Sequence, residues 1–185
     1  GLVGSEMCIR DIRKPMHTRR VEYRGFERDD GLWDIEGELV DSKPHAFVIE
    51  GEREWAPEEP IHHMSIRVTV DDRMVIRGVD VSMDAHPHDP CPQAMPPLQA
   101  LVGETLGKGW RKTIDRHLGG TVGCTHLREL LFNLATAAFQ TRVAAFTPAE
   151  GQPPLHLGQC RAWAFDGPVV EKVYPMFFRW QKPAR

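Results

Sequence analysis

The chain lacks any long apolar stretch. No run approaches the roughly 20 consecutive apolar residues that a membrane-spanning helix needs, and no secretory signal peptide is visible. Hydrophobic residues make up 41% and charged residues 26% of the 185 residues, which is the balance of a soluble globular protein with enough chain for a sizeable core. We therefore expect a cytoplasmic protein that makes no contact with a membrane.

Clustered positive charge is also scarce. The formal net charge is −3, and the basic cluster "RKPMHTRR" near the start is short. A surface that binds nucleic acid needs Lys and Arg gathered on one face. The composition therefore argues against nucleic acid as a partner and leaves an unknown protein or a small molecule.

Cysteine is infrequent, and the familiar site motifs are missing. The four cysteines form no tight pattern, which fits a reducing compartment better than a disulfide scaffold. The chain has no Cys-x-x-Cys, no His-Glu-x-x-His and no Gly-x-Ser-x-Gly. "GETLGKG" resembles a phosphate loop, but it is one residue short and lacks the Ser or Thr that would hold magnesium. Any chemistry must therefore come from residues that the fold brings together.

The first residues have no pattern in common with the rest. "GLVGSEMCIRD" resembles a translated sequencing adapter, and we exclude residues 1–12 from the fold analysis. We expect these residues to make no packed contacts with the core, which removes Cys8 from the candidate functional residues. Residues 13–185 are interpreted as a single domain.

From Arg19 to about Asp84, apolar and charged residues alternate with period two, and "DDG" and "DDR" occupy the turns. This pattern predicts an antiparallel meander of about four strands. The proline-rich segment 84–97 predicts a loop. Helices are expected from Pro96 or Pro97, over residues 110–118, and from Leu127 on, with Thr125 as the N-cap of the last. A C-terminal hairpin over about 156–180 would turn at "DGP". The order of strands, helices and strands predicts an α+β fold with helices packed on one face of the sheet.

Cys124 and His126 are the most conspicuous candidates for a site. They follow the glycine run "GGTVG" and lie where the last helix should begin. The positive end of a helix favours a thiolate, which is both a nucleophile and a metal ligand. A free cysteine is more often a small buried apolar residue, so Cys124 as plain core stays open.

Two further segments supply residues of the same chemical kind. Cys91 lies in the proline-stiffened "HPHDPCP", a loop that could hold a ligand in place before a metal arrives. His62 and His63 begin a predicted strand. Adjacent residues of a strand point to opposite faces, so a regular strand would bring only one of the two to a given site.

Four segments together resemble a known family. "RRVEYRGFERDDGLWDIEGELVDSK", "PIHHMSIRVTVDD", "CPQAMPPLQALVG" and "GGTVGCTHLRELL…TAAFQT" are similar to an uncharacterised bacterial family, domain of unknown function 2889, over residues 15–141. The family name implies no activity. The resemblance does imply that Asp is common at the position of His63, so His62 is the favoured ligand of the pair.

A more distant resemblance, from Glu59 to Ala145, is to the NifU-type iron–sulfur scaffold fold. It implies a metal site formed by His62 or His63 before a strand, Cys91 before one helix and Cys124 before another. The scaffold has three cysteines, and this chain has histidine at the first position. Two Cys with one or two His make a good zinc shell and match the ligation of Rieske-type clusters.

The sequence therefore predicts a metal-binding protein that holds zinc or an iron–sulfur centre. The predicted ligands are Cys91, Cys124, His62, His63 and His126. The alternatives are a metal-free small-molecule enzyme that uses a Cys/His pair, and an interaction module without chemistry. Whether the protein is an enzyme is left open at this stage.

Overall fold

The computed structural model describes residues 13–51, 53–142, 148 and 150–181. Its contacts divide the chain into two compact units, Gly1–Thr141 and Arg142–Arg185, whereas the sequence analysis treats residues 13–185 as one domain. The two units are described separately. The expectation for residues 1–12 lies outside the described residues.

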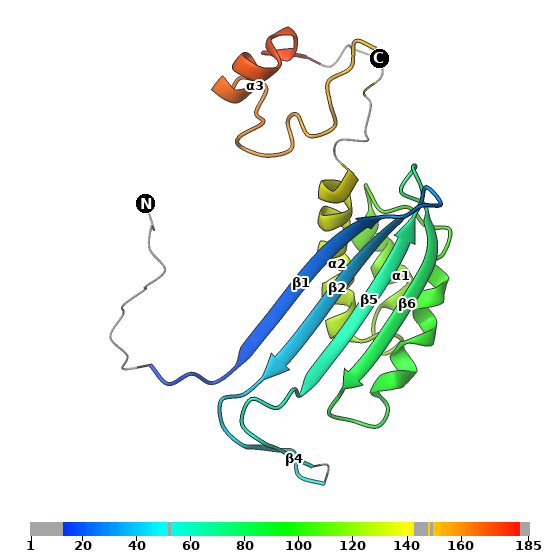
Figure 1. Cartoon of the computed structure of the whole chain (residues 1–185), viewed down its shortest axis with the longest axis vertical. Helices are drawn as coiled ribbons and strands as arrows, with labels where there is room; N and C mark the ends of the chain where they lie inside the picture. Colours follow the sequence, from blue (N-terminus) through cyan, green and yellow to red (C-terminus); the bar gives the residue numbers. More distant parts are fainter. Residues whose placement is uncertain (1–12, 52, 143–147, 149, 182–185) are drawn as a thin grey trace. The chain divides into compact units, whose positions relative to one another are not determined.

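A four-stranded antiparallel sheet is the largest element of the first unit (Figure 1). Strands β1 (Thr18–Glu27), β2 (Trp33–Ser42), β5 (His62–Val70) and β6 (Ile76–Ala85) lie in the order β1-β2-β5-β6. Every neighbouring pair is antiparallel. The four-stranded sheet predicted from the period of two is therefore confirmed, and its alternation places Ile35, Leu39, Ile66 and Val68 in the core.

A small two-stranded sheet lies between β2 and β5 in sequence. It pairs β3 (Phe47–Val48) with β4 (Glu54–Trp55), and the sequence analysis does not foresee it. Trp55 is almost fully buried, and its ring lies 5.8 Å from that of Phe47. Figure 1 shows this hairpin beyond the end of the large sheet at which β2 ends and β5 begins.

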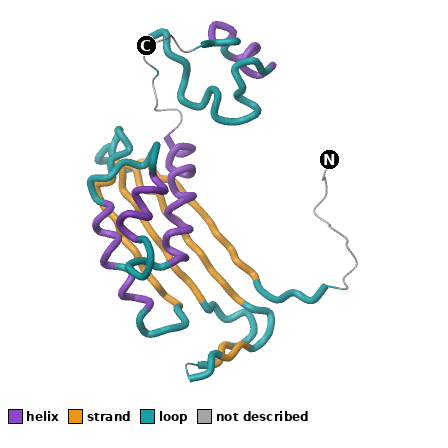
Figure 2. The backbone as a smooth tube through the Cα atoms, turned by 180° about the vertical axis from the view of Figure 1, so that it is seen from behind, coloured by secondary structure: helices purple, strands orange, loops and turns teal. Residues whose placement is uncertain are grey.

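Helices cover one face of the large sheet (Figure 2). They are the 3₁₀ helices η1 (Cys91–Ala94) and η2 (Pro96–Leu101) and the α-helices α1 (Trp110–Leu118) and α2 (Thr125–Arg142). The apolar stripe of α2 is buried, as the spacing predicts, through Leu127, Leu130, Leu131, Leu134 and Ala138. The α+β fold with helices on one face is therefore confirmed. No helix among the described residues is long and apolar enough to cross a membrane.

The second unit corrects one detail of the sequence analysis. Its described residues contain no strand, so the expected C-terminal hairpin over 156–180 is not formed there. The segment instead forms α3 (Pro168–Val173) and η4 (Pro175–Phe177), and Tyr174 between them packs in a cluster with His156 and Trp163. Pro168 and Pro175 each begin a helix, because a proline at the first helical position loses no hydrogen bond.

Candidate functional site

A cavity of about 560 Å³ lies where β2 ends, β5 begins and α2 starts. Two of its lining residues lie on the strand face that also carries the core residues. Asp41 follows Ile35 and Leu39 on β2 at even spacing, and His62 comes two residues before the buried Met64 on β5. The cavity therefore opens from the helix-covered side of the sheet. Its lining residues are His17, Arg19, Asp41, Lys43, Phe47, Ile49, Ile61, His62, Met64, Pro87, His88, Cys91, Cys124, Thr125 and His126.

Four of the five predicted ligands line this one cavity, although they come from three distant segments. They are His62 on β5, Cys91 at the start of η1, and Cys124 and His126 at the start of α2. His63 does not line it. As the next residue along the strand it points to the opposite face, where its Nε2 lies 2.7 Å from a carboxylate oxygen of Glu38.

Asp41 is the centre of the polar contacts in the cavity, with only 2% of its surface exposed. Arg19 holds both carboxylate oxygens, donating from Nε to Oδ1 at 2.7 Å and from its terminal nitrogen to Oδ2 at 2.8 Å. His17 lies on Oδ1 at 3.0 Å. A buried carboxylate needs such partners to remain charged, and here it has them.

Two histidine rings converge on the same oxygen of Asp41. Nδ1 of His62 lies 3.1 Å and Nε2 of His126 lies 3.5 Å from Oδ2. The two rings are 3.9 Å apart between centroids and are tilted by 34°. One ligand atom each from Asp41, His62 and His126 all lie within 4.8 Å of one another, an arrangement that could hold a metal ion.

Burial keeps the two imidazoles neutral. Desolvation, followed by the charge of His126, lowers the pKa of His62 to about 4. Desolvation and the charge of Arg19 lower the pKa of His126. Burial opposes ionisation of Asp41, but the hydrogen bonds and charge of Arg19 outweigh it, and the pKa of Asp41 is lowered. At neutral pH the cluster is therefore one carboxylate and two neutral imidazoles, the protonation state in which these groups bind metals.

The glycine run before Cys124 sets the position of the thiol. Gly120 has a φ of +60°, and a Cβ at Gly123 would lie 2.4 Å from the carbonyl oxygen of Leu118. The chain therefore turns tightly there, and Cys124, rather than Thr125, immediately precedes the helix, with its carbonyl accepting a hydrogen bond from the amide of Arg128.

The thiol of Cys124 extends the cluster. Its Sγ lies 3.7 Å from Nδ1 of His126 and 4.0 Å from the sulfur of Met64. A half-buried Cys91 lines the same cavity. Nitrogen, oxygen and sulfur donors are therefore gathered in one wall.

Asp41 and Arg19 were not predicted as site residues from the sequence. The signal for Asp41 was present in the sequence, because it continues the buried series Ile35, Gly37 and Leu39 on one face of β2. A carboxylate in a core position is rarely there without a partner or a function. Arg19 could not be predicted, because it faces Asp41 only through the pairing of β1 with β2, and the sequence does not give the register of that pair.

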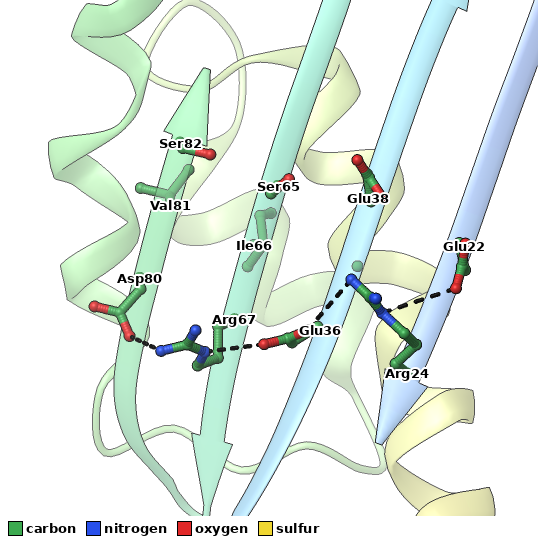
Figure 3. A pocket seen from close by; sticks show the side chains of 11 residues that line it. Glu22, Arg24, Glu36, Glu38, Ser65, Ile66, Arg67, Asp80, Val81 and Ser82 are labelled. Carbon is green, nitrogen blue, oxygen red and sulfur yellow. Dashed lines mark hydrogen bonds and ion pairs between the residues drawn. The ribbon is translucent and has the colours of Figure 1, made fainter. Parts of the chain in front are cut away.

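A second hollow, of about 300 Å³, lies on the sheet face away from the helices (Figure 3). A row of alternating charges crosses all four strands there, with ion pairs along it through Glu22, Arg24, Glu36, Arg67 and Asp80. The acids and bases satisfy one another, and this hollow holds neither a thiol nor a histidine. It is therefore weaker than the first cavity as a site of chemistry.

These observations define an α+β protein with a buried carboxylate–dihistidine cluster and a thiol in the wall of a cavity. The chain belongs to the family described as protein of unknown function (DUF2889), whose profile matches residues 17–140. That range contains every residue that lines the cavity. No curated protein and no solved structure matches the chain, so the resemblance to the iron–sulfur scaffold fold has no support from these comparisons.

Proposed function

We propose that this protein binds a divalent transition metal, zinc in the first place, through Asp41, His62 and His126. The observation that carries the proposal is the convergence of one oxygen and two ring nitrogens within 4.8 Å of one another. Ligand atoms around a tetrahedral zinc ion lie about 3.3 Å apart, given Zn–N and Zn–O bonds of about 2.0–2.1 Å. The two contacts of Oδ2 on Asp41, at 3.1 and 3.5 Å, bracket this value.

The types of ligand favour zinc over the hard cations. Imidazole suits zinc, copper, iron and nickel, whereas calcium and magnesium prefer oxygen alone. Three protein ligands with a cavity beside them correspond to the open zinc sites that bind water or a substrate in a fourth position. Arg19 and His17 fix the Asp41 carboxylate from behind, which is the role of the supporting groups around metal ligands.

The two cysteines of the cavity allow an iron–sulfur centre as an alternative to zinc. Cys91 and Cys124 with His62 and His126 would make the two-Cys, two-His ligation of an iron–sulfur centre. The proposed zinc site, by contrast, consists of Asp41, His62 and His126 and does not need Cys91. A Cys91→Ser variant therefore separates the two occupants: it abolishes the cluster and leaves zinc binding intact.

Anaerobic purification with elemental analysis tests the proposal, followed by titration of metal-free protein with Zn²⁺. We expect uptake of about one zinc per chain, and a Co²⁺ derivative with thiolate-to-metal charge-transfer absorption if Cys124 is bound. A content below about 0.1 equivalent of zinc and iron, with no uptake on titration, would contradict metal binding. Iron with acid-labile sulfide in the isolated protein would instead support the iron–sulfur centre.

A second candidate function is catalysis by a Cys/His pair without metal. The His126 ring lies between a thiol and a carboxylate. Its Nδ1 is 3.7 Å from Sγ of Cys124, and its Nε2 is 3.5 Å from Oδ2 of Asp41. A thiol, a base and a carboxylate that orients the base are the parts of a nucleophilic triad, and such contacts are often long before substrate binds. The substrate would be a small electrophile that fits the cavity.

Alkylation of Cys124 by iodoacetamide, measured by mass spectrometry on metal-free protein, tests this second function. His126→Ala should slow the reaction at Cys124 by at least about tenfold. The reaction at Cys160, which is exposed and lies in the second unit, should not change and serves as the control. An unchanged rate at Cys124 would exclude His126 as its base.

A further inference from the structure

Lys43 is a cation without a carboxylate in the wall of the cavity. Its ammonium lies 4.8 Å from the centre of the Phe47 ring, and no carboxylate pairs with it among the described residues. The other permanent cation, Arg19, is engaged by Asp41 and by Glu129. Lys43 is therefore the positive group that remains available to a bound molecule.

The wall near Lys43 is apolar. Phe47 and Ile49 come from the segment that contains the small sheet. Ile61 directly precedes β5, and Met64 lies near its start. Ile61 and Met64 are buried, and Phe47 and Ile49 are half-buried. Apolar walls with a few placed polar groups are typical of small-molecule sites, and a volume of about 560 Å³ lies within their usual range of about 300–1,000 Å³.

We infer that the cavity binds a small organic carboxylate, with its acid group on Lys43 and its apolar body against Phe47, Ile49 and Ile61. The inference rests on the proposed function in one respect: a bound Zn²⁺ at Asp41, His62 and His126 adds positive charge and an open coordination position to the same cavity. A ligand that extends from Lys43 to these three residues would place the end opposite its acid group beside the metal. The net charge of the whole chain, −3, does not by itself favour an anion, so the selectivity comes from this wall.

Benzoate is a suitable probe, and benzyl alcohol is its uncharged counterpart. Both are titrated calorimetrically into zinc-loaded wild type, Lys43→Met and Lys43→Arg, and each protein is also titrated with Zn²⁺ alone. We expect wild type to bind benzoate at least about tenfold more tightly than benzyl alcohol, because a charged hydrogen bond distinguishes the two. Lys43→Met should lose about that factor, and Lys43→Arg should keep most of it.

The two titrations separate the two ideas. Benzoate that binds no better than benzyl alcohol, or equally well to Lys43→Met and wild type, would overturn the carboxylate site, whatever the zinc titration gives. Absence of zinc uptake would overturn the metal site alone. In that case the same comparison of Lys43→Met with wild type, made on metal-free protein, decides the carboxylate site.

Discussion

At the scale of single residues, Asp41 is the centre of the polar contacts in the cavity. Its carboxylate is buried, is held on both oxygens by Arg19 and carries two neutral imidazoles on Oδ2. A buried charge of this kind is costly unless every lone pair has a partner. We therefore expect Asp41 to contribute both to the stability of this end of the sheet and to the proposed metal site.

Replacing Asp41 by Asn should destabilise the metal-free protein by about 1–3 kcal/mol, because Arg19 loses a buried ionic partner while the shape is kept. Urea unfolding at neutral pH measures the change. Asp80→Asn is the matched control, since Asp80 is 74% exposed and lies 3.8 Å from Arg67, and it should cost less than about 0.5 kcal/mol. An equal loss in the free energy of unfolding for the two substitutions would mean that the buried contacts of Asp41 stabilise the protein no more than the exposed ion pair of Asp80.

The pKa of His62 predicts how stability depends on pH. It is about 4 in the folded protein against about 6.5 in an unfolded chain. Between these values the unfolded state binds a proton that the folded state does not, so the free energy of unfolding falls as pH falls from about 6.5 towards 4. The lowered pKa values of His126 and Asp41 act in the same direction.

Urea unfolding of metal-free protein across this pH range measures the slope. His62→Gln removes one of the titrating groups and should make the dependence less steep. His63→Gln, on the opposite face of the same strand, should leave it as in wild type. A wild-type stability that is constant or rises towards pH 4 would contradict the neutral, desolvated state of His62.

At the residue scale, four residues of the cavity wall were predicted from the sequence, but the carboxylate at its centre was not. Spacing and residue type singled out His62, Cys91, Cys124 and His126. Alternation along β5 already limited His62 and His63 to one ligand between them. Asp41 was overlooked because a charged residue in a strand is usually solvated, and only its phase with the buried residues of β2 shows otherwise.

At the scale of elements, the turn before α2 controls where the thiol lies. A Cβ at Gly123 would meet the backbone oxygen of Leu118 at 2.4 Å and its Cβ at 2.9 Å. Neither atom can move without displacing the end of α1. The start of α2, with Cys124 and His126, is therefore positioned by this close approach.

Gly123→Ala should lower stability by about 1–3 kcal/mol through this overlap, and it should weaken zinc binding because the start of α2 must shift. Gly107→Ala is the control, since no atom lies within 4 Å of a Cβ at that position. Thermal unfolding and a zinc titration of both variants provide the measurement. If the Gly123→Ala protein were as stable as the Gly107→Ala protein, the turn would accommodate a Cβ at position 123, which would contradict the predicted overlap.

The elements differ in how far the sequence could predict them. The strands of the large sheet and α2 have long periodic patterns, and these were read correctly. Strands β3 and β4 are two residues each, too short to show a period. A C-terminal hairpin that turns at "DGP" was predicted over about 156–180, but Pro168 and Pro175 start short helices there, and the aromatic cluster packs without a sheet.

At the scale of the whole molecule, the first unit contains the complete candidate site. Every residue that lines the cavity lies between His17 and His126, within the first unit and within the range matched by the family. The second unit contributes none of these residues. Metal binding is therefore expected of the first unit.

A chain that ends at residue 147 should bind zinc with the affinity of the full chain, within about a factor of three. Calorimetric titration of the two chains side by side tests this, with circular dichroism as a check that the shorter chain is folded. A folded shorter chain with strongly reduced zinc affinity would mean that the site depends on residues beyond those described here for the cavity.

The most direct test of the account compares two neighbouring histidines of β5. Zn²⁺ is titrated, with a competing chelator, into metal-free wild type, His62→Ala and His63→Ala. The account predicts that His63→Ala binds zinc as wild type does, whereas His62→Ala binds at least about 100-fold more weakly, because losing a supporting group alone costs about 10–100-fold. Equal zinc affinity of the two variants, or no zinc binding by wild type, would contradict a metal site at Asp41, His62 and His126.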